Sequence, residues 1–276
     1  MPELPEVQTV RAGLEKLVLG TKITKVEIFY PKIIIGDTTE FCEKLVGQVI
    51  EKIDRRGKYL LFRFSNNLTM ISHLRMEGKY FVLPSKQEPK KHTHVVFELD
   101  NGQKLCYNDV RKFGRMQLVI TGQEESTTSL CKLGPEPVLP DFKVKDFYQA
   151  LQGKKKVIKT ALLDQSLVAG LGNIYVDEVL WMSKIHPQTL CNKITFAQAK
   201  VLHANIIEEL ALAVQAGGTT IRSYTDAFEH SGMFQFNLHV YGKKGQPCER
   251  CQTKIEKIVV GQRGTHFCPK CQKVSR

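Results

Sequence analysis

The sequence contains no apolar run long enough to cross a lipid bilayer, and no basic-then-apolar segment precedes its acidic start. Both absences predict an intracellular protein without a membrane partner, and we expect it in the cytoplasm. No internal repeat is visible along the 276 residues, a length that suggests one large or two moderate domains. With 42% hydrophobic and 25% charged residues, the composition is that of a globular protein.

Acidic residues are in short supply. Against 40 Lys and Arg the chain has 28 Asp and Glu, which gives a net charge of +12. Such an excess favours a polyanionic partner, with nucleic acid as the default and a merely solubilising surface as the alternative. The excess is uneven, because residues 241–276 carry nine Lys or Arg against two Glu. This distribution favours the nucleic-acid partner.

Cysteines fall into two groups of four. Cys42, Cys106, Cys131 and Cys191 show no spacing that indicates pairing, and we interpret them as small apolar residues or inert thiols. The other group forms two Cys-x2-Cys knuckles separated by sixteen residues, which predicts a closed tetrahedral site for one structural zinc ion. Disulfides, which the cytosol disfavours, and an iron–sulfur site are the alternatives. The predicted ligands are Cys248, Cys251, Cys268 and Cys271.

Apolar periodicity divides the rest of the chain into a part rich in predicted strands, which follows an N-terminal helix, and a part rich in predicted helices. Residues 7, 10, 14 and 17 recur at helical spacing, with Gly20 as a C-terminal cap. Short alternating runs at 23–29, 58–64, 68–74, 79–83 and 94–99 predict a β-sandwich or barrel, and Asn101-Gly102 predicts a hairpin. After a proline-rich linker at 134–140, helices are predicted from Asp146, at 156–164, at 173–183 and at 195–216. The fold class is therefore α+β.

The first six residues carry a possible nucleophile. If Met1 is removed, Pro2 becomes a terminal secondary amine that titrates near ~8 and is partly unprotonated at neutral pH. Its attack on a sugar C1′ leads to an iminium, and Glu3 or Glu6 could supply a proton to a ring or leaving oxygen. The alternative is structural: a proline and acidic residues are also typical of the first turn of a helix.

Several longer runs resemble the bacterial formamidopyrimidine-DNA glycosylases (8-oxoguanine DNA glycosylase and abasic-site lyase). They are MPELPEV at the start, RRGKYL from Arg55, SHLRMEG from Ser72, DVRKFG from Asp109 and LVAGLGNIYVDEVLW from Leu167. The resemblance implies an N-terminal catalytic β-sandwich with an N-terminal helix at 1–132. It also implies a helix-two-turns-helix DNA-binding domain with a lesion-capping loop at 133–240, and a β-hairpin zinc finger at 241–276.

The resemblance also implies roles for single residues. Pro2, Glu3, Lys58 and Arg263 are expected to be catalytic, with Glu6 as possible support. Met76 and Phe113 are implied to be apolar wedges that fill the space left by an extruded base. Arg111 is implied to read the base that had paired with it. Phosphate contacts are implied for His73, Asn173 and Tyr241. In isolation, Met76 and Phe113 would be core residues, and Lys58 and Arg263 solvated charges.

Lesion recognition is implied for a further set that includes a long irregular stretch after Gly217-Gly218. These residues are Glu77, Thr219, Ile221, Arg222, Ser223 and Tyr224. Two positions depart from the family pattern: Gln252 stands where Gly is common, and Asn108 where a basic residue is common. The first departure affects a zinc-knuckle turn, the second a DNA contact.

The resemblance thus implies a bifunctional enzyme that acts on damaged double-stranded DNA as a monomer associated with the nucleoid. It would excise 8-oxoguanine and formamidopyrimidines through a Schiff base on Pro2 and cleave the abasic site by β,δ-elimination, without an organic cofactor. One alternative is an endonuclease-VIII-like glycosylase for oxidised pyrimidines, although Leu4 stands where those relatives commonly carry Gly. The other is a zinc-finger DNA-binding protein without catalysis.

Overall fold

A computed structural model describes residues 1–127, 129–219 and 233–273 of the chain. The chain separates into two compact units. The first unit comprises Met1–Cys131 together with Gly217–Met233, and the second comprises Lys132–Ala216 together with Phe234–Arg276. This division assigns the stretch after helix α6 (Phe196–Gln215) to the first unit, and the three-domain division at 132/133 and 240/241 stays a prediction.

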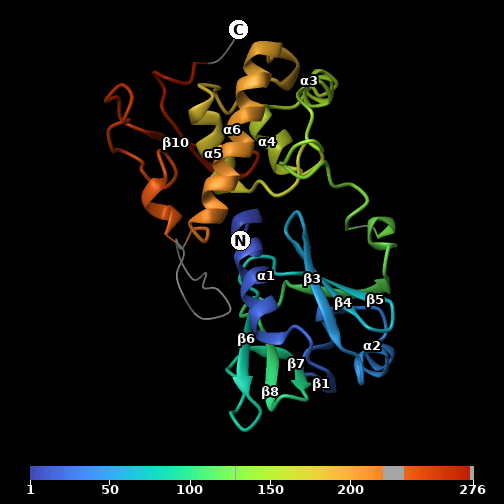
Figure 1. Cartoon of the computed structure of the whole chain (residues 1–276). Helices are drawn as coiled ribbons and strands as arrows, with labels where there is room; N and C mark the ends of the chain where they lie inside the picture. The colour runs from blue at the N-terminus through green and yellow to red at the C-terminus, as the bar shows by residue number, and fades with distance from the viewer. Residues whose placement is uncertain (128, 220–232, 274–276) are drawn as a thin grey trace. The chain divides into compact units, whose positions relative to one another are not determined.

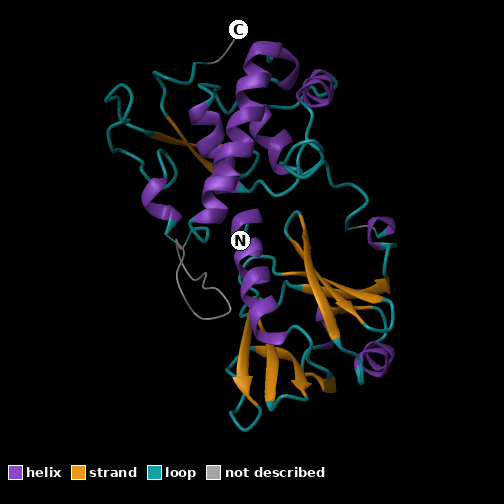
Figure 2. Cartoon of the chain, viewed as in Figure 1, coloured by secondary structure: helices purple, strands orange, loops and turns teal. Residues whose placement is uncertain are grey.

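The first unit is a β-sandwich whose two sheets are visible in the lower half of Figures 1 and 2. One sheet has the strand order β1-β7-β8-β6 and the other the order β2-β9-β5-β4-β3. Phe62 of β4 and Tyr80 of β6 pack ring against ring between the sheets, with centroids 5.5 Å apart. The strands are β1 (Ile23–Ile28), β2 (Ile34–Ile35), β3 (Ile50–Arg56), β4 (Tyr59–Phe64), β5 (Leu68–His73), β6 (Lys79–Pro84), β7 (Thr93–Leu99), β8 (Gln103–Asn108) and β9 (Arg115–Ile120).

Helix α1 (Leu4–Val18) carries the N-terminus against this sandwich. Its apolar stripe of Val7, Val10, Leu14 and Val18 is buried in the same core as the inner faces of both sheets. Arg11 Nη1 donates to the carbonyl oxygen of Ile53 in β3, 3.1 Å away, and so fixes the helix along that strand. The predicted helix is confirmed, and its start is held on a rigid element.

The second unit is helical and adds a small hairpin. Its helices are α3 (Val144–Gln152), α4 (Ile158–Leu163), α5 (Asn173–Met182) and α6 (Phe196–Gln215), and the hairpin pairs β10 (Glu256–Val260) with β11 (Arg263–Phe267). Helix α2 (Thr38–Leu45) belongs to the first unit. Apolar residues of α3, α4, α5 and α6 form one core. The helix predictions are confirmed to within one or two residues at most ends.

The hairpin turn between β10 and β11 explains the glycine at position 261. Gly261 and Gln262 have φ of +55° and +63°, as a two-residue turn of type I′ requires. A Cβ atom on Gly261 would lie 2.4 Å from Cγ2 of Thr160 in α4, so only glycine permits this packing. The hairpin tip is thereby seated on α4, next to Arg263.

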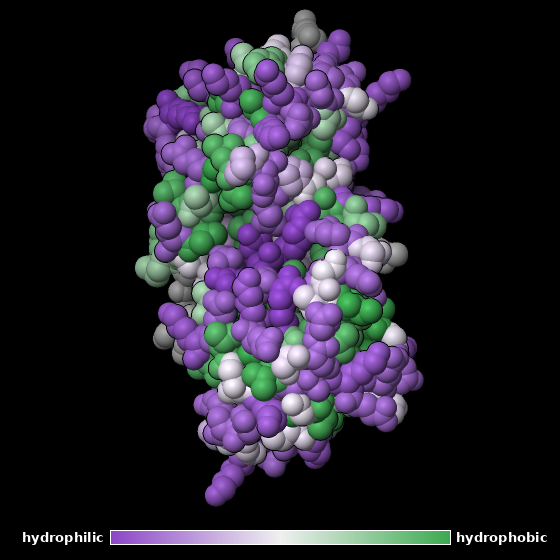
Figure 3. All heavy atoms as spheres, turned by 45° about the vertical axis from the view of Figure 1, so that its right-hand side comes forward, coloured by the Kyte–Doolittle hydropathy of each residue, from purple (hydrophilic) through white to green (hydrophobic). Residues whose placement is uncertain are grey.

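Within the part of the chain that the structure describes, no helix combines the length and the apolar character that crossing a membrane requires. Hydrophilic side chains cover most of the face drawn in Figure 3, with apolar residues between them.

Candidate functional site

The start of α1 forms a buried polar cluster in the first unit. Glu3 and Glu6 are each 2% exposed, although carboxylates are rarely buried without partners. Glu6 Oε2 accepts a hydrogen bond of 2.8 Å from the backbone N–H of Glu3. Its Oε1 accepts from the N–H and the hydroxyl of Thr219, at 2.8 and 3.1 Å. Glu6 therefore joins the chain start to the beginning of the stretch that follows α6.

Gly218 allows the backbone before Thr219 to approach the Glu6 carboxylate closely. It has φ of +76°, and a Cβ atom there would lie 2.7 Å from Glu6 Oε1. A side chain at this position would therefore displace the Glu6 carboxylate, so the close approach requires glycine. Thr219 is 3% exposed and lies beside Glu6 of the N-terminal cluster, and its role in lesion recognition stays a prediction.

Lys58 reaches the same cluster from the β3–β4 turn. Gly57, with φ of +55°, and Lys58 form the turn between the paired residues Arg56 and Tyr59. Arg55 holds this turn beside α1, because its Nε donates to Gln8 Oε1 at 3.0 Å and its Nη1 to the Gly57 carbonyl at 2.9 Å. Lys58 is 5% exposed, so its ammonium acts in a low-dielectric environment.

The charges of these groups act on the pKa of the N-terminal amine. Burial lowers the pKa of the amine at Met1 below its ordinary value of 8.0. Glu3 and Glu6 oppose this pKa shift, Lys58 adds to it, and Glu77 opposes it. The amine end of the chain thus lies among three carboxylates and one ammonium, an arrangement that can both deprotonate an amine and deliver a proton.

His73 ends β5 as a neutral imidazole. Burial, followed by the charges of Arg75 and Lys58, lowers the pKa of His73 from 6.5 to about 3. The backbone N–H of Arg75 donates to His73 Nδ1 at 2.8 Å, so the ring proton resides on Nε2. His73 can therefore donate one hydrogen bond without carrying charge, which suits a phosphate oxygen as acceptor.

The proposed wedge residues lie on two neighbouring loops of the first unit. Met76 and Glu77 lie between β5 and β6, while Arg111 and Phe113 lie between β8 and β9. Phe113 is 47% exposed, which a core residue would not be, and the Arg111 guanidinium lies 4.7 Å from its ring centroid. An exposed aromatic ring beside an arginine is an unusual surface feature that fits contact with a base pair.

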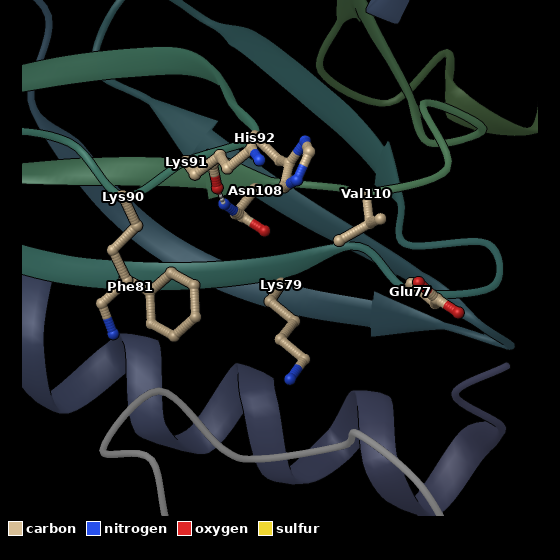
Figure 4. Close-up of a pocket in the computed structure, with 8 residues that line it drawn as sticks. All are labelled: Glu77, Lys79, Phe81, Lys90, Lys91, His92, Asn108 and Val110. Atoms are coloured by element: carbon tan, nitrogen blue, oxygen red, sulfur yellow. Dashed lines mark hydrogen bonds between the residues drawn. The ribbon is translucent and has the colours of Figure 1, made fainter.

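Glu77 also lines a cavity of about 210 Å³ in the first unit (Figure 4). Lysine side chains of β6 and of the loop before β7 surround it, and in Figure 4 Lys79 and Lys90 extend toward the same side. The ammonium of Lys90 lies 4.0 Å from the ring centroid of Phe81, so the aromatic face supports this cation.

In the second unit, Asn173 lies against the hairpin that carries Arg263. Asn173 opens α5, and its Nδ2 donates to the Gly264 carbonyl at 3.0 Å. Because an amide carries two N–H bonds, the second one remains for a ligand at the helix N-terminus. Arg263 is exposed at the tip of the hairpin, opposite Val260.

A buried ion pair supports this hairpin, and the sequence reasoning missed it. Lys159 Nζ lies 2.5 Å from Asp177 Oδ1, and both side chains are 0% exposed. Asp177 Oδ2 accepts from the backbone N–H of His266 at 2.8 Å, while Lys159 donates to the Gly264 carbonyl at 3.3 Å. The pair thus anchors two backbone groups of β11 directly beside Arg263.

Tyr241 is positioned by a second buried carboxylate of α5. Glu178 accepts backbone hydrogen bonds from His239, Val240 and Tyr241, at 2.7, 3.0 and 2.7 Å. The Tyr241 ring meets the imidazole of His266 edge-on, with centroids 5.0 Å apart. Asn173, Tyr241 and the hairpin of Arg263 therefore meet around α5, and their phosphate contacts stay a prediction.

The four predicted zinc ligands come together. The Sγ atoms of Cys248, Cys251, Cys268 and Cys271 all lie within 4.8 Å of one another. Zinc–sulfur bonds of about 2.3 Å in a tetrahedron place sulfurs about 3.8 Å apart, so small shifts suffice to accommodate the ion. Trp181 Nε1 donates to Cys248 Sγ at 3.5 Å, a hydrogen bond that stabilises a thiolate ligand.

Other sequence predictions have a different outcome. Ile221, Arg222, Ser223 and Tyr224 lie outside the described residues. Each unit collects its own predicted residues: the N-terminal cluster, His73 and the wedge loops in the first, and the phosphate and zinc residues in the second. The carboxylates that the sequence reasoning left without a role, Asp177 and Glu178, show no local signal, because in an apolar helix run they resemble ordinary surface charges.

Comparisons with known proteins cover nearly the whole chain. Family models match residues 1–116 (formamidopyrimidine-DNA glycosylase N-terminal domain), 133–225 (formamidopyrimidine-DNA glycosylase H2TH domain) and 245–274 (zinc finger found in FPG and IleRS). The last model spans the four-cysteine cluster, so the prediction of one structural zinc ion is confirmed.

Individual relatives agree with these models. The formamidopyrimidine-DNA glycosylase of Ligilactobacillus salivarius is 68% identical over 274 residues, which are 99% of each chain. The Lactococcus lactis Fpg in complex with DNA containing an abasic site is 45% identical with a TM-score of 0.93, over 98% of this chain and 99% of that one. A MutM structure in complex with carbocyclic 8-oxo-G containing DNA is also 45% identical, with a TM-score of 0.92, over 99% of this chain and 100% of that one.

Proposed function

The chain belongs to the formamidopyrimidine-DNA glycosylase family of DNA repair glycosylases, and from this premise we propose that it excises oxidised purines and then cleaves the abasic site. The substrates are 8-oxoguanine and formamidopyrimidines in damaged double-stranded DNA. Relatives of similar fold bind DNA that contains an abasic site or an 8-oxo-G analogue, which supports this choice. Activity on the abasic site extends the proposal beyond glycosylase action.

One observation carries the proposal: Pro2 is buried at the start of α1, next to the buried Glu3, Glu6 and Lys58, whose charges act on the pKa of the terminal amine. A solvated N-terminus would be mostly protonated and non-nucleophilic at neutral pH. Burial lowers the pKa of the amine at Met1 below its ordinary value, and Pro2 is more buried than Met1. After removal of Met1, the nucleophile is the secondary amine of Pro2.

The reaction proceeds by substitution at the sugar and then by elimination. The Pro2 nitrogen bonds to C1′ as the bond between C1′ and the base breaks, and the proton that the Pro2 nitrogen loses leaves with the base. Glu3 protonates the ring oxygen as the sugar opens, which leaves an iminium between Pro2 and C1′. The iminium acidifies the neighbouring carbon, so loss of a proton expels the 3′ phosphate, and a second elimination expels the 5′ phosphate.

Glu6 acts as a support for this chemistry. Its carboxylate is engaged by the N–H of Glu3 and by Thr219, so it holds the catalytic acid and the start of the lesion-capping stretch together. Lys58 stabilises the phosphate beside the sugar or transfers the proton that is lost in elimination.

The remaining predicted residues bind DNA. Lys58, His73, Asn173, Tyr241 and Arg263 contact the backbone, and these contacts should make affinity fall steeply with salt concentration. Met76 and Phe113 fill the space of the extruded nucleotide, and Arg111 reads the orphaned partner base.

Glu77 and Thr219, together with residues 221–224, contact the extruded base. Cys248, Cys251, Cys268 and Cys271 would hold one structural zinc ion, which would stabilise the finger that carries Arg263. Action as a monomer in the cytoplasm stays a prediction.

Borohydride trapping tests the proposal, because borohydride reduces an imine to a stable amine. Protein verified by mass to begin at Pro2 is mixed with an 8-oxoguanine·C duplex and, in parallel, a dihydrouracil duplex. A covalent adduct on the first duplex and little on the second supports the proposal. Pro5→Ala, a proline exchange at the same helix start, is the matched control and should retain trapping, whereas Pro2→Ala places a primary amine at the nucleophile position and should trap more weakly.

Two other outcomes contradict the proposal in different ways. The reverse preference assigns the protein to the repair of oxidised pyrimidines. The absence of an adduct on both duplexes, despite DNA binding, indicates a binding protein without catalysis.

A further inference from the structure

The two loops that carry the proposed wedge residues end on one buried side chain. The loop with Met76 ends at Gly78, and the loop with Arg111 and Phe113 ends at Gly114. A Cβ atom on Gly78 would lie 2.4 Å from the Tyr107 hydroxyl oxygen, and one on Gly114 only 1.6 Å from it. Both loop ends thus pack directly on that hydroxyl, and Tyr107 is 0% exposed.

Asp109 shapes the second of these loops from inside. It is 0% exposed, and its Oδ1 accepts from the backbone N–H of Arg111 at 3.0 Å. Its Oδ2 accepts from the N–H groups of Phe113 and Gly114, both at 2.8 Å, and from the Tyr107 hydroxyl at 3.4 Å. One carboxylate therefore holds three backbone N–H groups of this loop, a charge-assisted arrangement.

A third turn is tied to the same point. The backbone N–H of Asp109 donates to the His92 carbonyl at 3.0 Å, and His94 Nε2 bonds to the Asp109 carbonyl at 2.8 Å. Asn108 donates to the Lys91 carbonyl at 2.5 Å, a contact visible in Figure 4. His92 has φ of +68°, a strained conformation that persists only where surrounding contacts impose it.

We propose that Tyr107 and Asp109 form a positioning hub that sets how the enzyme fills the space of the extruded base and reads the opposite one. The hub touches no DNA and no reacting atom. It acts through the backbone of the two loops, which carry Met76 on one side and Arg111 and Phe113 on the other. This inference rests on the proposed function, because it assigns a determinant to the wedge residues of that function.

Position matters here because wedge and reader act only within narrow geometric limits. Productive constellations are held to about 0.5 Å by groups that are themselves locked by hydrogen bonds. Phe113 and Arg111 are exposed, so the side chains receive little support from neighbours on the free surface. Their placement therefore depends on the backbone hydrogen bonds to Asp109.

Asp109→Asn is the principal test. The substitution keeps the size of the side chain but replaces one acceptor oxygen by an NH2 group, which then faces at least one backbone N–H. For excision of 8-oxoguanine from a duplex we expect kcat/KM to fall by about tenfold to a hundredfold, the range for losing a hydrogen bond to a charged group. Cleavage of a single-stranded oligonucleotide with a preformed abasic site has no opposite base to read, and it should stay within about twofold of the wild type.

Discrimination between opposite bases is a second measurement, and a loss of stability alone would not change it. The ratio of kcat/KM with C opposite the lesion to that with A opposite should move toward one in Asp109→Asn, as it should in Phe113→Ala. Combining the two substitutions should cost little more than either alone, because both disable the same loop.

Tyr107→Phe and Tyr80→Phe form a matched pair. Tyr80 lies directly opposite Tyr107 on paired strands, and its buried hydroxyl bonds to the Ser72 hydroxyl at 2.7 Å instead of to the loops. Tyr107→Phe should reproduce the pattern of Asp109→Asn more weakly, and Tyr80→Phe should not. This pair tests the proposal even if Asp109→Asn fails to fold.

The outcomes separate the inference from the proposed function. If the wild type excises no lesion, the proposed function fails. If the wild type excises but hub variants lose duplex and single-strand activity equally, or keep their opposite-base ratio, the hub is wrong and the proposed function stands.

Discussion

The buried pair of Lys159 and Asp177 allows a quantitative test of how the second unit supports its hairpin. In Lys159→Met the ammonium is replaced by an apolar group of similar length. The carboxylate of Asp177 then remains 0% exposed without its ammonium partner, while its Oδ2 keeps the backbone N–H of His266 at 2.8 Å and the His266 Nδ1 at 3.4 Å. An unpaired buried charge is one of the most destabilising features a substitution can create.

The expected cost follows from this burial. Removing one partner of a buried pair costs about 3–5 kcal/mol, a large part of the ~5–15 kcal/mol that stabilises a whole protein. Replacing both charges, in Lys159→Met/Asp177→Leu, removes the unpaired carboxylate and leaves the N–H of His266 without its acceptor, a cost of about 1–3 kcal/mol. The double variant should therefore be more stable than the single one.

Urea unfolding of the zinc-loaded protein measures these differences. Lys156→Met is the matched control, because Lys156 pairs with Asp164 at 2.5 Å while its side chain is 47% exposed. Such a surface pair contributes about 0–1 kcal/mol. A single variant Lys159→Met that costs less than the control, or a double variant that is no more stable than the single one, would refute the reasoning.

Three further predictions concern pH and metal. Burial and the charge of Arg75 lower the pKa of His73 to about 3, so between pH 6.5 and 3 the unfolded chain binds a proton that the folded one does not. The free energy of unfolding should therefore fall as pH falls, by about 2 kcal/mol at pH 5, and His73→Gln should lack this part of the slope in urea titrations. Burial and Glu178 raise the pKa of Glu209 to about 8, so the folded state keeps a proton that the unfolded state loses between pH 4.5 and 8. Glu209→Gln should stabilise the protein by about 2–4 kcal/mol at pH 8 and much less at pH 5, and an equal effect at both would contradict this assignment. Chelation should release one zinc ion per chain from the four-cysteine cluster, measured with a colorimetric indicator, and should weaken DNA binding; release without any loss of affinity would contradict the supporting role of the hairpin.

The sequence predicted the elements whose signals are local. Periodicity of apolar residues identified α1 and the four helices of the second unit, and Asn101-Gly102 marked the turn between β7 and β8. Short elements such as β2, with two residues, and α2, with eight, gave no signal because they span too few periods. The four cysteines were predictable for the same local reason, since zinc requires a fixed ligand spacing.

Contacts between distant residues could not be predicted. Glu6 and Thr219 are 213 positions apart, and the sequence around neither residue predicts their hydrogen bond. The structural and the chemical interpretation of the first six residues are also not exclusive, because Glu6 accepts from the N–H of Glu3 at the helix start while lying beside the amine.

The motif around Asp109 shows a second limit of prediction from sequence. The sequence drew attention to Arg111 and Phe113, which are exposed, but the residue that holds them is the buried aspartate. Its importance lies in three backbone hydrogen bonds that a sequence pattern does not encode.

The central claim is that the terminal amine of Pro2 is the nucleophile, and the site of the trapped bond tests it most directly. The borohydride adduct formed with an 8-oxoguanine duplex is digested with nuclease and protease, and the modified peptide is located by mass spectrometry. The account predicts a remnant of the sugar on the first residue of the peptide that begins at Pro2. A remnant on Lys58, or unmodified Pro2 in protein that has cleaved its substrate, would contradict it.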